Sequence, residues 1–290
     1  MGKNIAIFGS NGQLGKTFQE LSSLFRGKYN MYFFDKTQLN IQDKRMLEYF
    51  TSKYKFNYVI NCAAYTDVNL AEVEQEKAYA VNYSSVKNIA FLAKEYNLTF
   101  IHISTDYVFD GKSCIPYKEN DMTNPLNIYG ESKLRGEKAI IDIGSKNTII
   151  IRTSWLYSDY KINFVNTIRS LSKKNKEIDV VFDQVGTPTY ARDLAKMILN
   201  ILPLIQNDKP EIYHYSNEGI ASWYDFAREI IRLSKFNCKV RPVETRSFFT
   251  SVKRPSYSVL NKDKIKGKFY ITIPHWKRSL KECIRYLKEV

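Results

Sequence analysis

The chain has 290 residues, of which 44% are apolar and 26% are charged, as in globular proteins of one or two domains. No apolar run approaches the ~20 residues of a membrane span, and no signal-peptide pattern precedes the first strand, so we expect a cytoplasmic protein without a membrane partner. The formal net charge of +14 is dispersed and no recognised nucleic-acid module is present, which argues against nucleic acid as the partner. It favours a solvated basic face or a positive field around a cleft for anionic nucleotides.

Cysteines and histidines are few and far apart in the sequence: Cys62, Cys114, Cys238, Cys283, His102, His214 and His275. No Cys-x-x-Cys pair occurs, which favours reduced thiols. We therefore expect no metal site and no histidine-based catalytic triad.

The first recognisable motif is a glycine turn between a strand and a helix. Residues 5–8 form a short apolar strand, and residues 16–25 have helical apolar spacing. Between them, Gly9 permits a tight turn, Gly12 lets the backbone approach a pyrophosphate, and Gly15 allows close packing of the helix. This context predicts dinucleotide binding, although the spacing is G-x-x-G-x-x-G rather than G-x-G-x-x-G.

An acidic residue ends the second strand, residues 32–34. Asp35 could accept hydrogen bonds from an adenosine ribose, which would favour NAD. Lys36 beside it could instead neutralise a 2′-phosphate, so the residues leave the choice between NAD and NADP open.

Small and polar residues follow the third and fourth strands, residues 58–61 and 99–103. Ala63 and Ala64 could let a flat cofactor lie close, or could serve tight core packing. A long helix is expected over residues 72–95. Thr105 and Asp106 follow the fourth strand, at the edge where catalytic groups of open α/β sheets gather. An ordinary turn at the strand end would account for them equally well.

Tyr129 and Lys133 are four residues apart in a helix that follows a polar loop, residues 116–125. This spacing puts both side chains on one face of the helix. A phenol gives up its proton more readily beside an ammonium group, so the pair suits proton donation. Tyr-x-x-x-Lys alone is a weak signal, because the chain has 21 tyrosines and many lysines.

With residues 148–152 as a further strand, the first half alternates strands and helices, which predicts a doubly wound parallel sheet. The second half is more mixed, with helices at 163–172, 190–202, 223–233 and 276–287, strands at 179–182 and 212–215, and an extended stretch at 239–245. We expect residues 1–155 to form an NAD(P)-binding domain of the α/β class, to which 179–203 return. Residues 156–178 and 204–290 would form a smaller mixed α/β lobe that binds the substrate.

These residues, in this order, resemble the extended short-chain dehydrogenase/reductases and, within them, the dTDP-4-dehydrorhamnose reductases. The likeness runs from residue 3 to about residue 230, and more faintly to the end. It is carried by the glycine turn and by five further segments: Val59–Thr66 with Ala71 and Glu72, Ser104–Gly111, Pro125–Leu134 with Gly136 and Glu137, Arg152–Trp155, and Asp183–Thr189.

The resemblance implies a Rossmann-type fold and a role for each matching residue. Cofactor contacts would come from Gly9, Gly12, Gln13 and Leu14 at the pyrophosphate, Asp35, Asn40 and Ile41 at the adenosine, Ala63 and Ala64 at the centre, and Tyr129 and Lys133 near the nicotinamide ribose. Tyr129 would be the proton donor, and Lys133 would tune it. Thr105 and Asp106 would bind the substrate carbonyl, and Trp155 would pack near the sugar. Relatives often carry Asp where Asn40 stands, which leaves cofactor preference open.

The implied reaction is reduction of the 4-keto group of dTDP-4-dehydro-6-deoxy-L-mannose by NADPH or NADH, giving dTDP-L-rhamnose for cell-surface polysaccharide. The implied partner is this dTDP-sugar, and a homodimer is compatible with the resemblance. Two alternatives remain. One is another nucleotide-sugar reductase or epimerase of the same superfamily. The other is a non-catalytic binding protein like the regulatory subunit of methionine adenosyltransferase.

Overall fold

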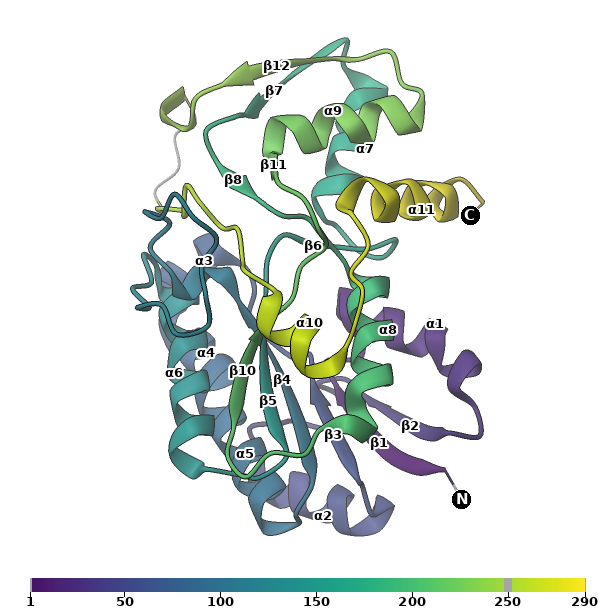
Figure 1. The fold of residues 1–290 in the computed structure, drawn as a ribbon, viewed down its shortest axis with the longest axis vertical. Coiled ribbons are helices and arrows are strands. Elements are labelled where there is room, and N and C mark those ends of the chain that lie inside the picture. Colours follow the sequence, from purple (N-terminus) through teal and green to yellow (C-terminus); the bar gives the residue numbers. More distant parts are fainter. Residues whose placement is uncertain (1, 248–251, 290) are drawn as a thin grey trace.

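A six-stranded parallel sheet forms the centre of the computed structural model, which describes residues 2–247 and 252–289 (Figure 1). The strands lie in the order β10-β5-β4-β3-β1-β2, and every neighbouring pair is parallel. Their bounds are β1 Lys3–Phe8, β2 Tyr29–Phe34, β3 Tyr58–Asn61, β4 Thr99–Thr105, β5 Thr148–Thr153 and β10 Glu211–His214. This arrangement confirms the expected α/β class with a doubly wound parallel sheet.

Helices cover both faces of the sheet, because successive strand residues point to opposite sides. In β1, Ile5 and Ile7 pack into one apolar cluster, whereas Ala6 and Phe8 pack into another. The first cluster is closed by α1 Gln13–Leu21, α8 Ala191–Ile201 and α10 Asp263–Phe269. The second is closed by α2 Lys44–Tyr54, α5 Ser85–Glu95 and α6 Ile128–Ile143.

A smaller lobe lies above the carboxyl ends of the strands (Figure 1). It contains α7 Phe164–Lys174, α9 Trp223–Ser234, α11 Trp276–Glu289 and three short strand pairs: β7 Glu177–Val181 with β12 Lys239–Val243, β8 Val185–Gly186 with β11 Ala221–Ser222, and β6 Leu156–Tyr157 with β9 Thr189–Tyr190. The lobe has its own core around Phe226, Ile230 and Leu280. 3₁₀ turns lie at Ser22–Phe25, Asp106–Val108, Leu202–Leu204 and Thr245–Ser247.

Two strands lie outside the part of the molecule in which the sequence placed them. β10 was expected in the lobe but pairs with β5 at the sheet edge, and α10 packs beside it. β7 falls partly in the range 179–203, expected to return to the sheet, but pairs with β12 in the lobe. In that range α8 does return, packing against α1. Strand partners are non-local, so short apolar runs do not reveal which sheet a strand joins. The domain division itself stays a prediction.

The helix expected over residues 72–95 is divided into several pieces. The structure has α3 Val68–Val73, α4 Gln75–Tyr79, a π-helical turn at Ala80–Ser84, and then α5. Asn82 in the π turn binds the main chain of Tyr65 through both ends of its amide. The wider turn thus aims this side chain at the loop after β3, and π turns often mark functional sites. None of the described helices has the length and apolar character needed to cross a membrane.

Candidate active site

The glycine turn joins β1 to α1 and lies against the end of β3. Gly9 has φ +78°, and a Cβ there would come within 2.5 Å of the Ala63 nitrogen. A Cβ on Gly15 would meet the Gly9 carbonyl, whereas a Cβ on Gly12 would approach only that carbonyl oxygen, at 3.2 Å. Gly12 also begins α1 without any side-chain cap. The first N–H groups of α1 are therefore available to an anion, as the pyrophosphate prediction requires.

Gln13 and Leu14, expected at the pyrophosphate, direct their side chains elsewhere. Gln13 Oε1 accepts a hydrogen bond of 3.0 Å from the Ser158 hydroxyl, beyond β6. Leu14 is buried in the core under the sheet. The side-chain oxygen of Gln13 thus joins the glycine turn to the lobe, while its amide NH₂ and the main-chain N–H groups of both residues remain for a phosphate.

Asp35 lies at the carboxyl end of β2, beside the glycine turn. Its Oδ2 accepts a hydrogen bond of 2.6 Å from Asn11 Nδ2. Its Oδ1 accepts from the Thr37 N–H and hydroxyl and from the Gln38 N–H. These hydrogen bonds hold the pKa of Asp35 below its ordinary value, so the half-buried carboxylate is charged and bound to its own loop.

The other residues expected at the cofactor occupy the following loop and the end of β3. Asn40 is exposed, and its Oδ1 accepts from the Gln42 N–H at 3.1 Å. Ile41 and Ala63 pack against the apolar cluster under α2 and α5, and Ala64 is half-buried. The structure thus brings Ala63 directly to the glycine turn, whereas Asn40 and Ile41 lie in the loop before α2.

Thr105, Asp106 and Tyr129 meet at the carboxyl end of β4. The Thr105 hydroxyl donates to Asp106 Oδ1 at 3.0 Å and accepts from the Tyr107 N–H at 3.2 Å. A further hydrogen bond joins Thr105 to Tyr129. Burial raises the pKa of Tyr129 to about 12, opposed by the Thr105 bond and assisted by the Asp106 charge. Tyr129 therefore carries its proton near neutral pH, as a proton donor must.

Asp106 is a buried carboxyl beside this hydroxyl pair. Burial raises the pKa of Asp106 to about 6, although hydroxyls of Ser258 and Thr105 hold it down. Ser258 comes from a segment that pairs with the lobe, since its N–H donates to the Val185 carbonyl at 2.7 Å. Asp106 thus contacts both Thr105 at the carboxyl edge of the sheet and Ser258, whose segment pairs with the lobe.

Lys133 lies one turn after Tyr129 on α6 and is 1% exposed. Its Nζ donates to the Ile103 carbonyl at 2.6 Å and lies 3.2 Å from His102 Nε2. Burial lowers the pKa of Lys133 to about 8. The sequence placed Lys133 beside the tyrosine, and the structure instead brings its amine to two residues of β4.

Trp155 belongs to the lobe rather than to the cluster around Tyr129. Its ring stacks on Trp223 with centroids 3.5 Å apart and planes 7° apart. Gly186 lies on the ring as well, because a Cβ there would come within 2.5 Å of the indole. These neighbours restrict access to the ring, and the predicted role of Trp155 near the sugar stays a prediction.

The sequence did not reveal the polar groups that hold α6 in place. Asn82 Nδ2 donates to the Ser132 hydroxyl at 3.0 Å. The main-chain oxygen of Asn82 occupies the space that a Cβ on Gly136 would need, so this position requires glycine. Arg152 of β5 donates to Glu137 through Nε at 3.0 Å and Nη2 at 2.7 Å, with both side chains buried. The segment Gly136-Glu137, which is part of the resemblance, was the sequence feature that could have indicated these contacts.

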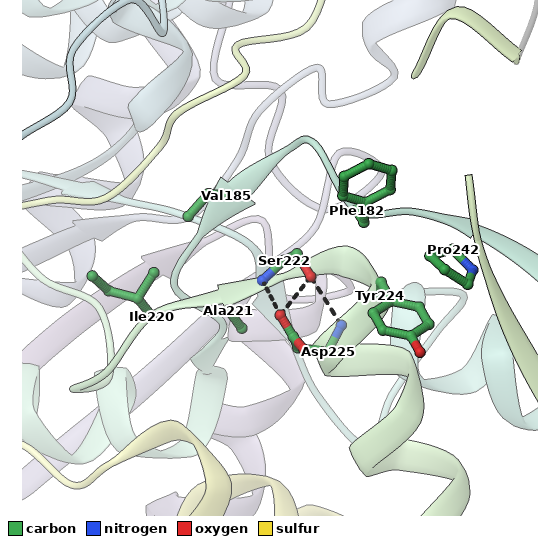
Figure 2. A pocket seen from close by; sticks show the side chains of 8 residues that line it. All are labelled: Phe182, Val185, Ile220, Ala221, Ser222, Tyr224, Asp225 and Pro242. Atoms are coloured by element: carbon green, nitrogen blue, oxygen red, sulfur yellow. Dashed lines mark hydrogen bonds between the residues drawn. The ribbon is translucent and has the colours of Figure 1, made fainter. Parts of the chain in front are cut away.

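A separate pocket of about 420 Å³ lies in the lobe (Figure 2). Figure 2 shows Phe182, Tyr224 and Pro242 at one end and Val185 and Ile220 at the other. Between them, Ser222 and Asp225 hydrogen-bond to each other as the cap of α9. None of the residues predicted for the site lines this pocket.

Comparison with known proteins places these features in a family. The model of the family described as the RmlD substrate binding domain matches residues 3–289. A dTDP-4-dehydrorhamnose reductase of Aggregatibacter actinomycetemcomitans is 38% identical, over 97% of this chain and 98% of its own. A dTDP-4-keto-6-deoxy-D-glucose reductase of Streptomyces niveus is 32% identical, over 97% and 96%.

The crystal structure of a dTDP-4-dehydrorhamnose reductase from Bacillus anthracis, in complex with NADP, is similar throughout. It superposes with a TM-score of 0.93 at 36% identity, covering 99% of this chain and 100% of that one.

Proposed function

This chain belongs to the family of the RmlD substrate binding domain, and on that premise we propose that it is a dTDP-4-dehydrorhamnose reductase. It reduces the 4-keto group of dTDP-4-dehydro-6-deoxy-L-mannose with NADPH or NADH and forms dTDP-L-rhamnose, a precursor of cell-surface polysaccharide. The observation that carries the chemistry is the hydrogen-bonded pair of Thr105 and Tyr129 at the end of β4, with Tyr129 protonated.

The described residues suit a dinucleotide. The glycine turn leaves the amino end of α1 without a side-chain cap, which favours a pyrophosphate, and Asp35 offers a charged carboxylate nearby. When bound, the reduced nicotinamide supplies a hydride to the ketone carbon. We propose that Asp35, Asn40, Ile41, Ala63 and Ala64 border it, and that Lys133 holds its nicotinamide ribose.

The chain's own residues manage the charge that develops on the ketone oxygen. We propose that Tyr129 donates its proton to this oxygen while Thr105 hydrogen-bonds to it. In the structure the single proton of the Thr105 hydroxyl is donated to Asp106 Oδ1 at 3.0 Å, so it turns from the carboxylate to the ketone oxygen when the substrate binds. Such groups raise the rate because they stabilise charge that is present only in the transition state. Trp155 would border the sugar.

A second candidate substrate follows from the relative in Streptomyces niveus, whose name specifies the D-gluco ketone. This relative is 32% identical to the chain, and the rhamnose reductase of Aggregatibacter actinomycetemcomitans is 38% identical, so the sugar's stereochemistry needs a direct test. An epimerase converts the D-keto sugar into the L-keto sugar, so assays with and without that enzyme distinguish the two substrates.

The test supplies purified protein with dTDP-4-keto-6-deoxy-D-glucose, with and without the epimerase that forms the L-sugar. Loss of reduced-nicotinamide absorbance is followed with NADPH and with NADH in separate cuvettes, and the product is identified. We expect fast oxidation only with the epimerase, and dTDP-L-rhamnose as product. Oxidation without the epimerase would assign the D-gluco substrate instead. No oxidation, with NADPH still bound in calorimetry, would favour a non-catalytic regulatory protein.

A further inference from the structure

His102 lies in the middle of β4 with its side chain fully buried, and no step of the proposed reaction uses it. Its Nε2 is 3.2 Å from Lys133 Nζ, and its Nδ1 is 3.3 Å from Asn61 Nδ2. The imidazole therefore joins the end of β3 to the lysine of α6. The hydrogen bonds around it decide which of its nitrogens carries the proton.

The amide of Asn61 has only one orientation that satisfies its neighbours. The Ala63 N–H donates to Asn61 Oδ1 at 3.1 Å, so the amide nitrogen faces His102. An amide nitrogen only donates, and His102 Nδ1 must therefore carry the lone pair. Reversing the amide would place its NH₂ against the Ala63 N–H, with two donors facing each other.

The remaining proton of the imidazole then points at the lysine. Burial holds the pKa of His102 well below its ordinary value, so the ring is neutral. A neutral imidazole has one N–H, which here lies on Nε2. A hydrogen bond from this N–H needs a lone pair on Lys133 Nζ, and only a neutral amine has one. Nζ keeps its own donor for the Ile103 carbonyl at 2.6 Å.

The groups that face Lys133 provide no free negative charge. Glu137 on α6 would favour the ammonium form, but it is paired with Arg152. Burial raises the pKa of the Cys62 thiol, which leaves it uncharged, and Tyr129 keeps its proton. These surroundings agree with the low pKa of Lys133, about 8, for which burial is the main cause.

We propose that His102 is a positioning residue that stabilises the neutral amine of Lys133 against its ammonium form in the free protein, so that binding of the reduced cofactor is accompanied by proton uptake at Lys133. The inference rests on the proposed function, in which Lys133 contacts the nicotinamide ribose. The anionic phosphates of the cofactor favour the ammonium form. The proton comes from the solvent and stays on Nζ, and no covalent bond to the cofactor forms.

Calorimetry of NADPH binding to the full chain tests this directly, in buffers that differ in ionisation enthalpy. The free protein should take up about half a proton at about pH 8 and about a tenth of a proton at about pH 7. No sugar is needed for this measurement. Absence of NADPH binding would overturn the proposed function together with this inference, whereas binding without proton uptake would overturn the inference alone.

Substitution of His102 assigns the effect to this residue. In His102→Gln, the amide oxygen can turn toward Nζ and stabilise the ammonium form. We expect the uptake at about pH 8 to fall to about a tenth of a proton, as for a pKa one unit higher. His214→Gln is the matched control, since His214 is also fully buried in the sheet but contacts the Tyr117 carbonyl, and it should keep the wild-type uptake. Equal uptake in His102→Gln and wild type would overturn the role of His102.

Discussion

Tyr129 and Lys133 lie one turn apart on α6, yet the Lys133 amine contacts Ile103 and His102 of β4, and the Tyr129 hydroxyl bonds to Thr105. The two side chains share a helix face, as their spacing predicts, but each is held by a different part of one strand. In the protein without cofactor, the pKa of Tyr129 is raised by burial rather than lowered by the lysine. We therefore expect Lys133 to act on the tyrosine only once a ribose has been bound between them.

Removing the Tyr129 hydroxyl should abolish most turnover and leave binding intact. The ring of Tyr129→Phe keeps its edge contact with Tyr107 at 5.5 Å, so the fold and NADPH affinity should stay unchanged. We expect kcat to fall about 10²-fold or more, because a general acid is lost. Steady-state kinetics with the L-keto sugar checks this, and Tyr213→Phe on β10 is the control. Turnover near the wild-type rate in Tyr129→Phe would rule out its role as the donor.

Breaking the buried ion pair under α6 should destabilise the fold strongly. Glu137→Gln leaves Arg152 as a buried cation, since the two side chains are 1% and 3% exposed. We expect a loss of about 3 to 5 kcal/mol in the free energy of unfolding. The control is Glu131→Gln on the same helix, whose exposed pair with Arg135 should contribute about 1 kcal/mol or less. Urea unfolding measures both, and similar losses would refute the distinction.

Stability should depend on pH through Asp106. Its pKa is raised from 3.8 to about 6, so the folded state holds this proton more tightly than the unfolded chain. The stabilisation is fully present below about pH 4 and is lost as the pH rises through about 6. Relative to Asp106→Asn, wild type should lose on the order of 2 kcal/mol between about pH 4 and about pH 7. Urea unfolding across this range measures the difference.

Asp110 provides a control for that experiment, because its contribution to the free energy of unfolding should change with pH in the opposite direction. The Lys112 N–H is the main cause that holds the pKa of Asp110 below its ordinary value. Its stabilisation is present above the unfolded pKa and is lost as the pH falls. A difference between wild type and Asp106→Asn that does not change with pH would mean that Asp106 keeps an ordinary pKa.

Gly9→Ala should damage both stability and cofactor binding. The positive φ of Gly9 costs an alanine about 1 to 2 kcal/mol, and the new Cβ would also meet the main chain of Ala63. Gly144→Ala is the matched control, because Gly144 has φ +67° and a Cβ there would approach no atom closer than the Ile141 carbonyl oxygen at 3.9 Å. We expect Gly9→Ala to lose about 2 kcal/mol or more and to bind NADPH weakly. Equal losses in the two variants would contradict the close contact.

The sequence predicted those features that depend on neighbouring residues. The apolar run of β1 and the glycines after it define the strand, the turn and the start of α1. Tyr129 and Lys133 share a face because helical spacing is regular. By contrast, the contact of Lys133 with His102, the stack of Trp155 on Trp223, and the pairing of β10 with β5 join residues far apart in the chain. Periodicity carries no information on such partners.

The π-helical turn at Ala80–Ser84 imposes a constraint on chain length. It accommodates one residue more than an α-helical turn would, so the segments on either side keep nearly the phase of a continuous α-helix. Deleting a single residue there should restore α geometry without turning α5 away from α4, but it should break the two hydrogen bonds through which Asn82 holds the main chain of Tyr65. A deletion within α5 itself would instead turn the buried face of the helix by about 100°.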